Sequence, residues 1–195
     1  MSKVYYHVSS YISEGQKLTA NTKNNLEYRQ YISTCEVSTY HKFVESYQKI
    51  NNDETYQQTG WSVEKWMCEA IFEYVRKEEY PDKPSRIWGL FLSKNLEASL
   101  DFKKEKRPTR IDKDGIKTEA HIYCIKIPDE TIVHAFDMTL YTEADQALQK
   151  GLKNKELYDY IIKKAKEYWR GCLTVSADIE YLVSGDIVVG KQVLI

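Results

Sequence analysis

The chain is predicted to adopt an α+β fold, because strand-like and helix-like segments follow one another without the regular strand-helix-strand succession of a parallel sheet. Helical segments are inserted mainly after the first strand and before the last two. The sequence contains no internal repeat, no low-complexity tract and no linker. Its 195 residues are enough for one full hydrophobic core, so a single domain over residues 1–195 is expected.

The predicted helices rest on apolar residues that recur three and four positions apart. The clearest case covers residues 62–79, where Ser62 is a suitable N-cap and Pro81 follows the last apolar position. Its stripe of aromatic and aliphatic residues is typical of a helix that packs into a core. Further helices are predicted at residues 38–50 behind Ser38 or Thr39, at 95–102, at 142–150, and at 155–169 before Gly171.

Strands are predicted where short apolar or alternating runs are bounded by turn residues. Residues 14–36 show no sustained period and are expected to form a polar connection. The highly charged residues 103–118 contain Asp114-Gly115 as a turn signal and are expected to form an exposed hairpin or loop. The predicted strands are 3–9, 86–93, 120–126, 131–136, 173–183 and 186–194.

Charge and cysteine content argue against several classes of protein. With 28 basic and 29 acidic residues, the net charge of −1 gives no global attraction to nucleic acid or to an anionic membrane. The four cysteines are scattered, without a CxxC pair or a histidine at ligand spacing, so neither a metal site nor a disulfide framework is expected. No signal peptide and no run of about 20 apolar residues is present. We therefore expect a cytoplasmic protein with reduced thiols and no membrane partner.

Three common signatures of nucleotide binding and hydrolysis are missing from the sequence. It contains neither GxGxxG nor GxxxxGK[ST], which argues against a Rossmann domain and a P-loop. It also lacks the GxSxG nucleophile elbow of α/β-hydrolases. Any enzymatic function must therefore use a different set of residues.

Three short segments, spread over nearly the entire chain, carry the candidate functional residues. The first strand contains His7-Val8-Ser9, in which the two polar side chains share one face of the strand. The second segment is Gly89-Leu90-Phe91-Leu92, with Phe102 following, and the third is Glu180-Tyr181-Leu182-Val183. In this order they resemble the His-Gly-Ser strand, the tyrosine-bearing strand and helix, and the Glu-Tyr-hydrophobic-Val strand of diphtheria-toxin-like and poly(ADP-ribose)-polymerase-like ADP-ribosyltransferases. The resemblance implies that family's split, mostly antiparallel sheet and NAD as substrate.

The resemblance assigns the catalytic role to Glu180. Cleavage of the bond between nicotinamide and ribose builds oxocarbenium-like positive charge on the sugar, and a carboxylate aimed at the sugar stabilises that charge. By resemblance, Glu180 also binds the ribose 2′-hydroxyl, and His7 completes the catalytic set by holding the adenosine ribose.

The other roles implied by the resemblance concern nicotinamide. The backbone N–H and C=O of Val8 would pair with the carboxamide, and Ser9 Oγ would accept a hydrogen bond from it. Phe91 and Phe102 would stack on the ring. Arg86 is a candidate for binding the NAD phosphates, since a guanidinium binds phosphate through two hydrogen bonds, with a structural salt bridge as the alternative.

The sequence departs from the family pattern at three points. Val8 replaces a glycine, which an extended backbone tolerates. Phe91 and Phe102 replace tyrosines, so the stacking face is kept while a hydroxyl is lost. Asp178 stands two residues before Glu180, where arginine-modifying transferases carry a glutamate and others a glutamine. The choice of acceptor is therefore left open.

The expected function is NAD-dependent transfer of ADP-ribose to a macromolecular acceptor, a protein or a nucleic acid. Bacterial or phage effectors, toxins and counter-defence proteins of this size would fit. One alternative is the related RNA 2′-phosphotransferase, which uses the same fold and NAD but depends on an arginine and histidine set that is not recognisable here. The other is a catalytically inactive binding module on the same fold.

Overall fold

The computed structural model describes residues 4–20, 32, 34–53, 62–106, 110–111, 117–151 and 154–194. The chain divides into two compact units. The sheet unit comprises Met1–Ala20, Leu90–Val133 and Tyr181–Ile195, and the helical unit comprises Asn21–Gly89 and His134–Glu180. Each unit is described below by itself, and the expectation of one domain over residues 1–195 stays a prediction.

The sheet unit is built on a four-stranded antiparallel sheet. Its strands are β1 (Val4–Ser9), β6 (His121–Lys126), β9 (Gly185–Gln192) and β2 (Lys17–Ala20), in the order β1-β6-β9-β2. The prediction of a polar connection over residues 14–36 was wrong for β2. Leu18 of this strand pairs with Ile187 of β9 and packs against the core, a contact that the local sequence does not reveal.

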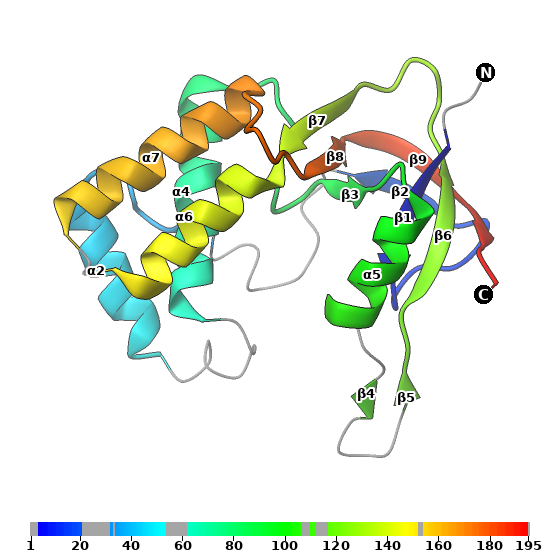
Figure 1. The fold of residues 1–195 in the computed structure, drawn as a ribbon, viewed down its shortest axis with the longest axis horizontal. Helices are drawn as coiled ribbons and strands as arrows, with labels where there is room; N and C mark the ends of the chain where they lie inside the picture. The colour runs from blue at the N-terminus through cyan, green and yellow to red at the C-terminus, as the bar shows by residue number, and fades with distance from the viewer. Residues whose placement is uncertain are drawn as a thin grey trace. The chain divides into compact units, whose positions relative to one another are not determined.

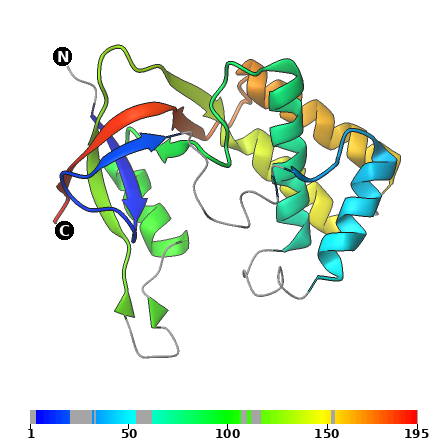
Figure 2. The same ribbon diagram turned by 180° about the vertical axis from the view of Figure 1, so that it is seen from behind.

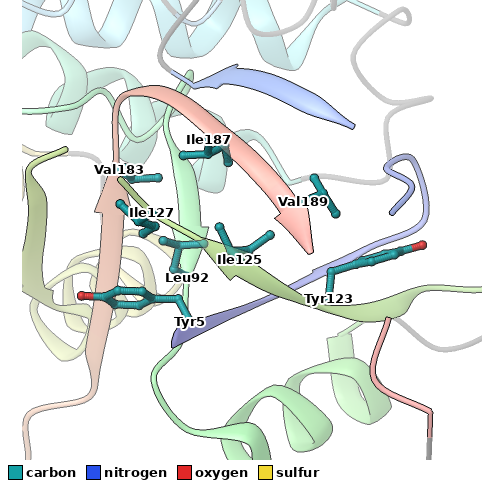
Figure 3. Close-up of a cluster of buried hydrophobic side chains, with 8 residues drawn as sticks. All are labelled: Tyr5, Leu92, Tyr123, Ile125, Ile127, Val183, Ile187 and Val189. Atoms are coloured by element: carbon teal, nitrogen blue, oxygen red, sulfur yellow. The ribbon is translucent and has the colours of Figure 1, made fainter. Parts of the chain in front are cut away.

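A second sheet contributes to the same core. It has the order β3-β8-β7, formed by β3 (Leu90–Leu92), β8 (Ile179–Val183) and β7 (Val133–Asp137), and β3 pairs antiparallel with β8. The boundary between the units falls within β7 and within β8. Side chains from both sheets form the buried cluster in Figure 3, which comprises Tyr5, Leu92, Tyr123, Ile125, Ile127, Val183, Ile187 and Val189.

The other face of the four-stranded sheet is covered by α5 (Leu96–Lys106), which runs beside β1 and β6 in Figure 1. Leu96 and Leu100 of this helix pack against Val8 and Ile122. Beyond the helix, β4 (Arg110–Ile111) and β5 (Lys117–Thr118) pair antiparallel, as expected for the predicted hairpin. Residues 103–106, which the prediction assigned to the hairpin or loop, belong to α5 instead. The predicted turn at Asp114-Gly115 lies outside the described residues.

The helical unit contains α2 (Tyr40–Asn51), α4 (Val63–Glu79), α6 (Met138–Lys150) and α7 (Lys155–Arg170), which lie together in Figure 2. Thr39 and Ser62 cap α2 and α4 as predicted, and Gly171 ends α7 in the left-handed conformation with φ of 81°. The interior is aromatic, and Trp169 Nε1 donates a 2.7 Å hydrogen bond to the carbonyl of Phe72, joining α7 to α4.

Three predicted boundaries were wrong because side chains cap or tie the backbone. The helix predicted at 142–150 begins at Met138, since Asp137 caps its first turn. The strand predicted at 86–93 is confined to Leu90–Leu92, because Ser85 Oγ accepts from the N–H groups of Ile87 and Trp88 and holds a turn there. The strand predicted at 173–183 begins only at Ile179, because the residues before it form a loop tied to Asp137.

The architecture is α+β, as predicted, since helices and strands are both present and the pairings β1-β6, β6-β9, β2-β9, β3-β8 and β4-β5 are antiparallel. In the part of the chain that the structure describes, no helix combines the length and apolar character needed to cross a membrane.

Candidate functional site

The backbone of Val8 presents a donor and an acceptor at the outer edge of the four-stranded sheet. β1 is an edge strand, and Val8 lies opposite Ile122 of β6. The N–H of Tyr6 donates to Ser93 O at 2.8 Å, and the carbonyl of Tyr6 accepts from Ser93 N at 2.9 Å. Because backbone groups two residues apart point to the same side of a strand, the N–H and C=O of Val8 point to the edge that Tyr6 uses, away from β6.

The pairing of Ile122 supports this orientation. Its carbonyl accepts from the N–H of Val193 at 2.8 Å, so it points away from β1. Val8 and Ile122 therefore form a pair without mutual hydrogen bonds. Among the described residues, no backbone hydrogen bond from another segment reaches Val8. The edge of β1 thus offers the donor and acceptor pair that the sequence predicts for binding a carboxamide.

His7 and Ser9 flank Val8 and are held by different contacts. His7 Nδ1 lies 2.7 Å from the carbonyl oxygen of Phe91, and because a carbonyl only accepts, Nδ1 carries the proton. In the neutral ring, Nε2 is then the acceptor nitrogen. Ser9 is buried, and its Oγ accepts from the N–H of Tyr11 at 3.1 Å. The structure therefore joins two predicted cofactor-binding residues, His7 and Phe91, by a direct hydrogen bond.

The two predicted stacking residues lie on β3 and α5. Leu90 and Leu92 pack against the core, so Phe91 between them points to the opposite face of β3. Phe102 is 46% exposed on α5, a helix that uses Leu96 and Leu100 for packing. Stacking of either phenylalanine on nicotinamide stays a prediction.

Glu180, the predicted catalytic residue, belongs to the helical unit and is held by two donors. Its Oε1 accepts hydrogen bonds from Arg86 Nη1 and from the hydroxyl of Tyr168, the latter at 2.6 Å. The same hydroxyl accepts from Arg86 Nη1 at 2.8 Å. The Glu180 side chain is 14% exposed, so the carboxylate is fixed at the margin of a largely buried network.

Arg86 is shared between two carboxylates. Its Nε and Nη2 donate to Glu69 of α4 at 3.2 and 3.3 Å, while Nη1 reaches Glu180. The guanidinium carbon lies 4.1 Å from the ring centre of Tyr141, and only 3% of the side chain is exposed. These contacts favour the structural salt bridge for Arg86, and its predicted contact with the NAD phosphates stays a prediction.

Burial and charge act against each other in this network. Burial raises the pKa of Glu180 above its usual value, although Arg86 and Tyr168 act in the opposite direction. Burial disfavours the charge on Arg86, but Glu180 and Glu69 outweigh burial and raise its pKa well above the usual value. One guanidinium thus serves two carboxylates, and the network retains negative charge when both carboxylates are ionised.

A buried aspartate fixes the loop that leads to Glu180. Asp137 is fully buried; its Oδ1 accepts from the N–H groups of Thr139 and Asp178 at 2.9 and 3.1 Å, and its Oδ2 accepts from Thr174 N at 2.7 Å. Burial alone would raise the pKa of Asp137, but these hydrogen bonds outweigh burial and lower it. The backbone just before Glu180 is therefore anchored at several points.

The sequence did not indicate the partners of Arg86 and Glu180. Tyr168 lies within the helix predicted at 155–169, and the structure shows that its hydroxyl donates a hydrogen bond to Glu180. Glu69 and Glu73 lie four residues apart on α4 and are both buried, Glu73 against Arg76 and Ser85. Two carboxylates at this spacing beside an otherwise apolar helix face are the signal that could have indicated buried cationic partners.

A cavity of about 280 Å³ in the helical unit lies elsewhere, between α4 and the residues around Cys35. It contains none of the predicted site residues. Burial raises the pKa of Cys35 to about 11, so its thiol is not activated as a nucleophile. The candidate functional residues are therefore those of the β1 edge and of the Glu180 network.

Comparison with known proteins identifies the family of the chain. A search of curated proteins found no match. A family model described as "Protein of unknown function (DUF2441)" matches residues 5–194, which include all of β6, β9 and α7 and all of β1 except Val4. The chain therefore belongs to the DUF2441 family.

Proposed function

We propose that this protein is an NAD-dependent ADP-ribosyltransferase that acts on a macromolecular acceptor, a protein or a nucleic acid, in a cytoplasm. The outward N–H and C=O of Val8 carry the proposal. A primary carboxamide has one acceptor oxygen and two donor hydrogens, so it matches the donor and acceptor of one extended residue. Nicotinamide bound in this way would lie beside His7 and Ser9.

Glu180 supplies the catalytic carboxylate in this proposal. Its Oε1 is oriented by Arg86 and Tyr168, so the carboxylate does not need to reorganise when positive charge develops on the ribose. The acceptor then attacks the anomeric carbon as the bond to nicotinamide breaks; nicotinamide leaves with that bond's electron pair, and the acceptor releases its proton to water. The proposal uses residues of both units, and the experiments test each unit separately.

A second candidate is an NAD-binding module without turnover. The ion pair between Glu180 and Arg86 favours it, because a neutralised carboxylate stabilises an oxocarbenium ion less well. Such a module would bind NAD through β1 but would never release nicotinamide.

The binding half of the proposal is tested by Val8→Pro. Proline removes the outward N–H of Val8, and an edge strand tolerates proline where its N–H is not part of the ladder. Calorimetry should show that NAD binding is lost while the thermal midpoint stays close to that of Val8→Ala, the control for lost packing against Ile122. NAD binding equal to that of Val8→Ala would contradict the carboxamide contact.

The catalytic half is tested with NAD labelled in its adenylate, incubated with a cell lysate. Label should enter protein or nucleic acid, and Glu180→Gln should reduce this transfer by about 10²–10³. Glu130→Gln, at an exposed turn, is the matched control and should transfer normally. NAD binding without transfer to any acceptor would favour the binding module, and no NAD binding would overturn both candidates.

A further inference from the structure

We propose that Glu69 and Tyr168 are positioning residues for Glu180, with Tyr168 fixing Oε1 and Glu69 holding Arg86 back from full pairing, so that Oε2 is the oxygen presented to the substrate. This inference rests on the proposed function for its kinetic consequences. Its structural content concerns only the helical unit.

Both hydrogen bonds that the described residues donate to the Glu180 carboxylate end on the same oxygen, Oε1. The donors are Arg86 Nη1 and the Tyr168 hydroxyl. The donors are themselves joined, because Arg86 Nη1 donates to the Tyr168 hydroxyl. This closed set of three groups leaves Oε2 as the oxygen that a ribose can reach without breaking the network.

The orientation of Arg86 is fixed by groups other than Glu180. Glu69 accepts from Nε and Nη2, and the Tyr141 ring lies under the guanidinium at 4.1 Å. The ring of Tyr168 also lies 5.2 Å from the guanidinium carbon, and that ring stacks on Phe136 at 4.7 Å. The guanidinium therefore cannot turn toward Glu180 to offer a second N–H while Glu69 is charged.

Glu69 consequently determines how much negative charge remains on Glu180. Two carboxylates share one cation, so each is only partly neutralised. Among the described residues, the charged and titratable groups that act on the pKa of Glu180 are Arg86, Tyr168 and Glu69, and Tyr141 acts on Arg86. Without the charge on Glu69, Arg86 would pair with Glu180 alone and lower the pKa of Glu180. Without the Tyr168 hydroxyl, Oε1 would lose a donor and the pKa of Glu180 would rise.

The assignment predicts that Glu69→Gln and Tyr168→Phe shift the pKa of Glu180 in opposite directions. The side-chain carboxyl carbons of ¹³C-labelled glutamate should be titrated by NMR in the wild type, Glu69→Gln and Tyr168→Phe, with Glu180→Gln identifying the resonance of Glu180. Glu69→Gln should lower the pKa of Glu180, and Tyr168→Phe should raise it. Glu73→Gln, one turn further along α4 and also buried, where Glu73 pairs with Arg76, should leave the pKa of Glu180 unchanged.

Measurement of kcat and KM then distinguishes a positioning role of Glu69 and Tyr168 from a role in folding alone. In both variants kcat for nicotinamide release should fall by about 10²-fold with little change in KM, since a displaced group costs about this much. Shifts of the Glu180 pKa in the same direction, or no shift in either variant, would overturn the positioning role. If Glu69→Gln does not fold, Glu69→Asp, whose shorter side chain weakens its hold on Arg86, must still lower that pKa. If the wild type releases no nicotinamide with any acceptor, the proposed function fails, and the NMR titration still decides the inference.

Discussion

Arg86 joins several buried groups in the interior of the helical unit. It is buried, it neutralises parts of two carboxylates, and its guanidinium lies against the rings of Tyr141 and Tyr168. A guanidinium suits this place better than an ammonium group, because its planar shape lets it donate to two carboxylates and stack on a ring at the same time. Removing it would leave Glu69 and Glu180 buried without a cation.

We therefore expect Arg86→Met to reduce the free energy of unfolding by about 3–5 kcal/mol, the usual cost of breaking a buried ion pair on one side. Chemical denaturation at neutral pH measures this loss. Lys155→Met is the control, because its ion pair with Asp159 is largely exposed and contributes only a small fraction of that energy. If Arg86→Met lowered the free energy of unfolding no more than Lys155→Met does, the stabilising role of the Arg86 network would be contradicted.

Asp137 gives the stability of the helical unit a particular dependence on pH. Its pKa is lower in the folded protein than in the unfolded chain, so its contribution is present above its usual pKa and is lost as the pH falls through the folded value. Asp137→Asn should therefore be destabilised at pH 7, with the difference from the wild type shrinking toward pH 3. Thermal denaturation of both proteins over this range measures the difference. A constant difference would contradict the role of the charge; the raised pKa of Glu180 acts with the opposite sign but is common to both proteins.

At the scale of elements, β9 is an inner strand of the four-stranded sheet and pairs with a strand on each side. It lies between β6 and β2, and it contributes Ile187 and Val189 to the buried cluster. Its pairing with β6 is irregular between Tyr123 and Ile125, where the two backbones approach closely. A Cβ atom on Gly190 would lie 2.7 Å from the carbonyl oxygen of Cys124, closer than real Cβ contacts allow.

Gly190→Ala should therefore destabilise the sheet unit by about 1–3 kcal/mol, because the neighbouring atom belongs to the backbone and cannot turn aside. Denaturant unfolding measures the loss. Val188→Ala on the same strand is the control, since Val188 is partly exposed and truncating it creates no clash. A smaller effect at Gly190 than at Val188 would mean that β6 and β9 adjust at little cost.

At the scale of the whole molecule, both units are assembled from separate segments of the chain, which passes from one unit to the other four times. The C-terminal segment supplies part of β8 and all of β9. A chain that ends at Ser184 should therefore lose the four-stranded sheet, and its NMR spectrum should lack the dispersed amide signals of that sheet. Removal of the last two residues is the control, because Leu194 is 86% exposed. Retention of those dispersed signals in the chain ending at Ser184 would contradict the central place of β9.

The sequence predicted what local patterns determine and missed what distant partners determine. The helix at Val63–Glu79 and the strand at Val4–Ser9 were predicted closely, because periodicity and caps are local. β2 was missed, because its four residues become a strand only through pairing with β9, far along the chain. The Glu180 network was missed for the same reason, since Glu69, Arg86 and Tyr168 come from three separate segments.

The loop at residues 171–178 also determines where a protease can cut. Leu173 and Val175 extend their side chains into solvent, and both are suitable targets for a protease that prefers apolar residues. A protease must draw several residues into an extended conformation, and the bonds from Thr174 and Asp178 to Asp137 prevent this while they persist. Where opening is fast, the cleavage rate follows the population of the open loop. Nicking at Leu173 therefore measures how often the backbone before Glu180 is released.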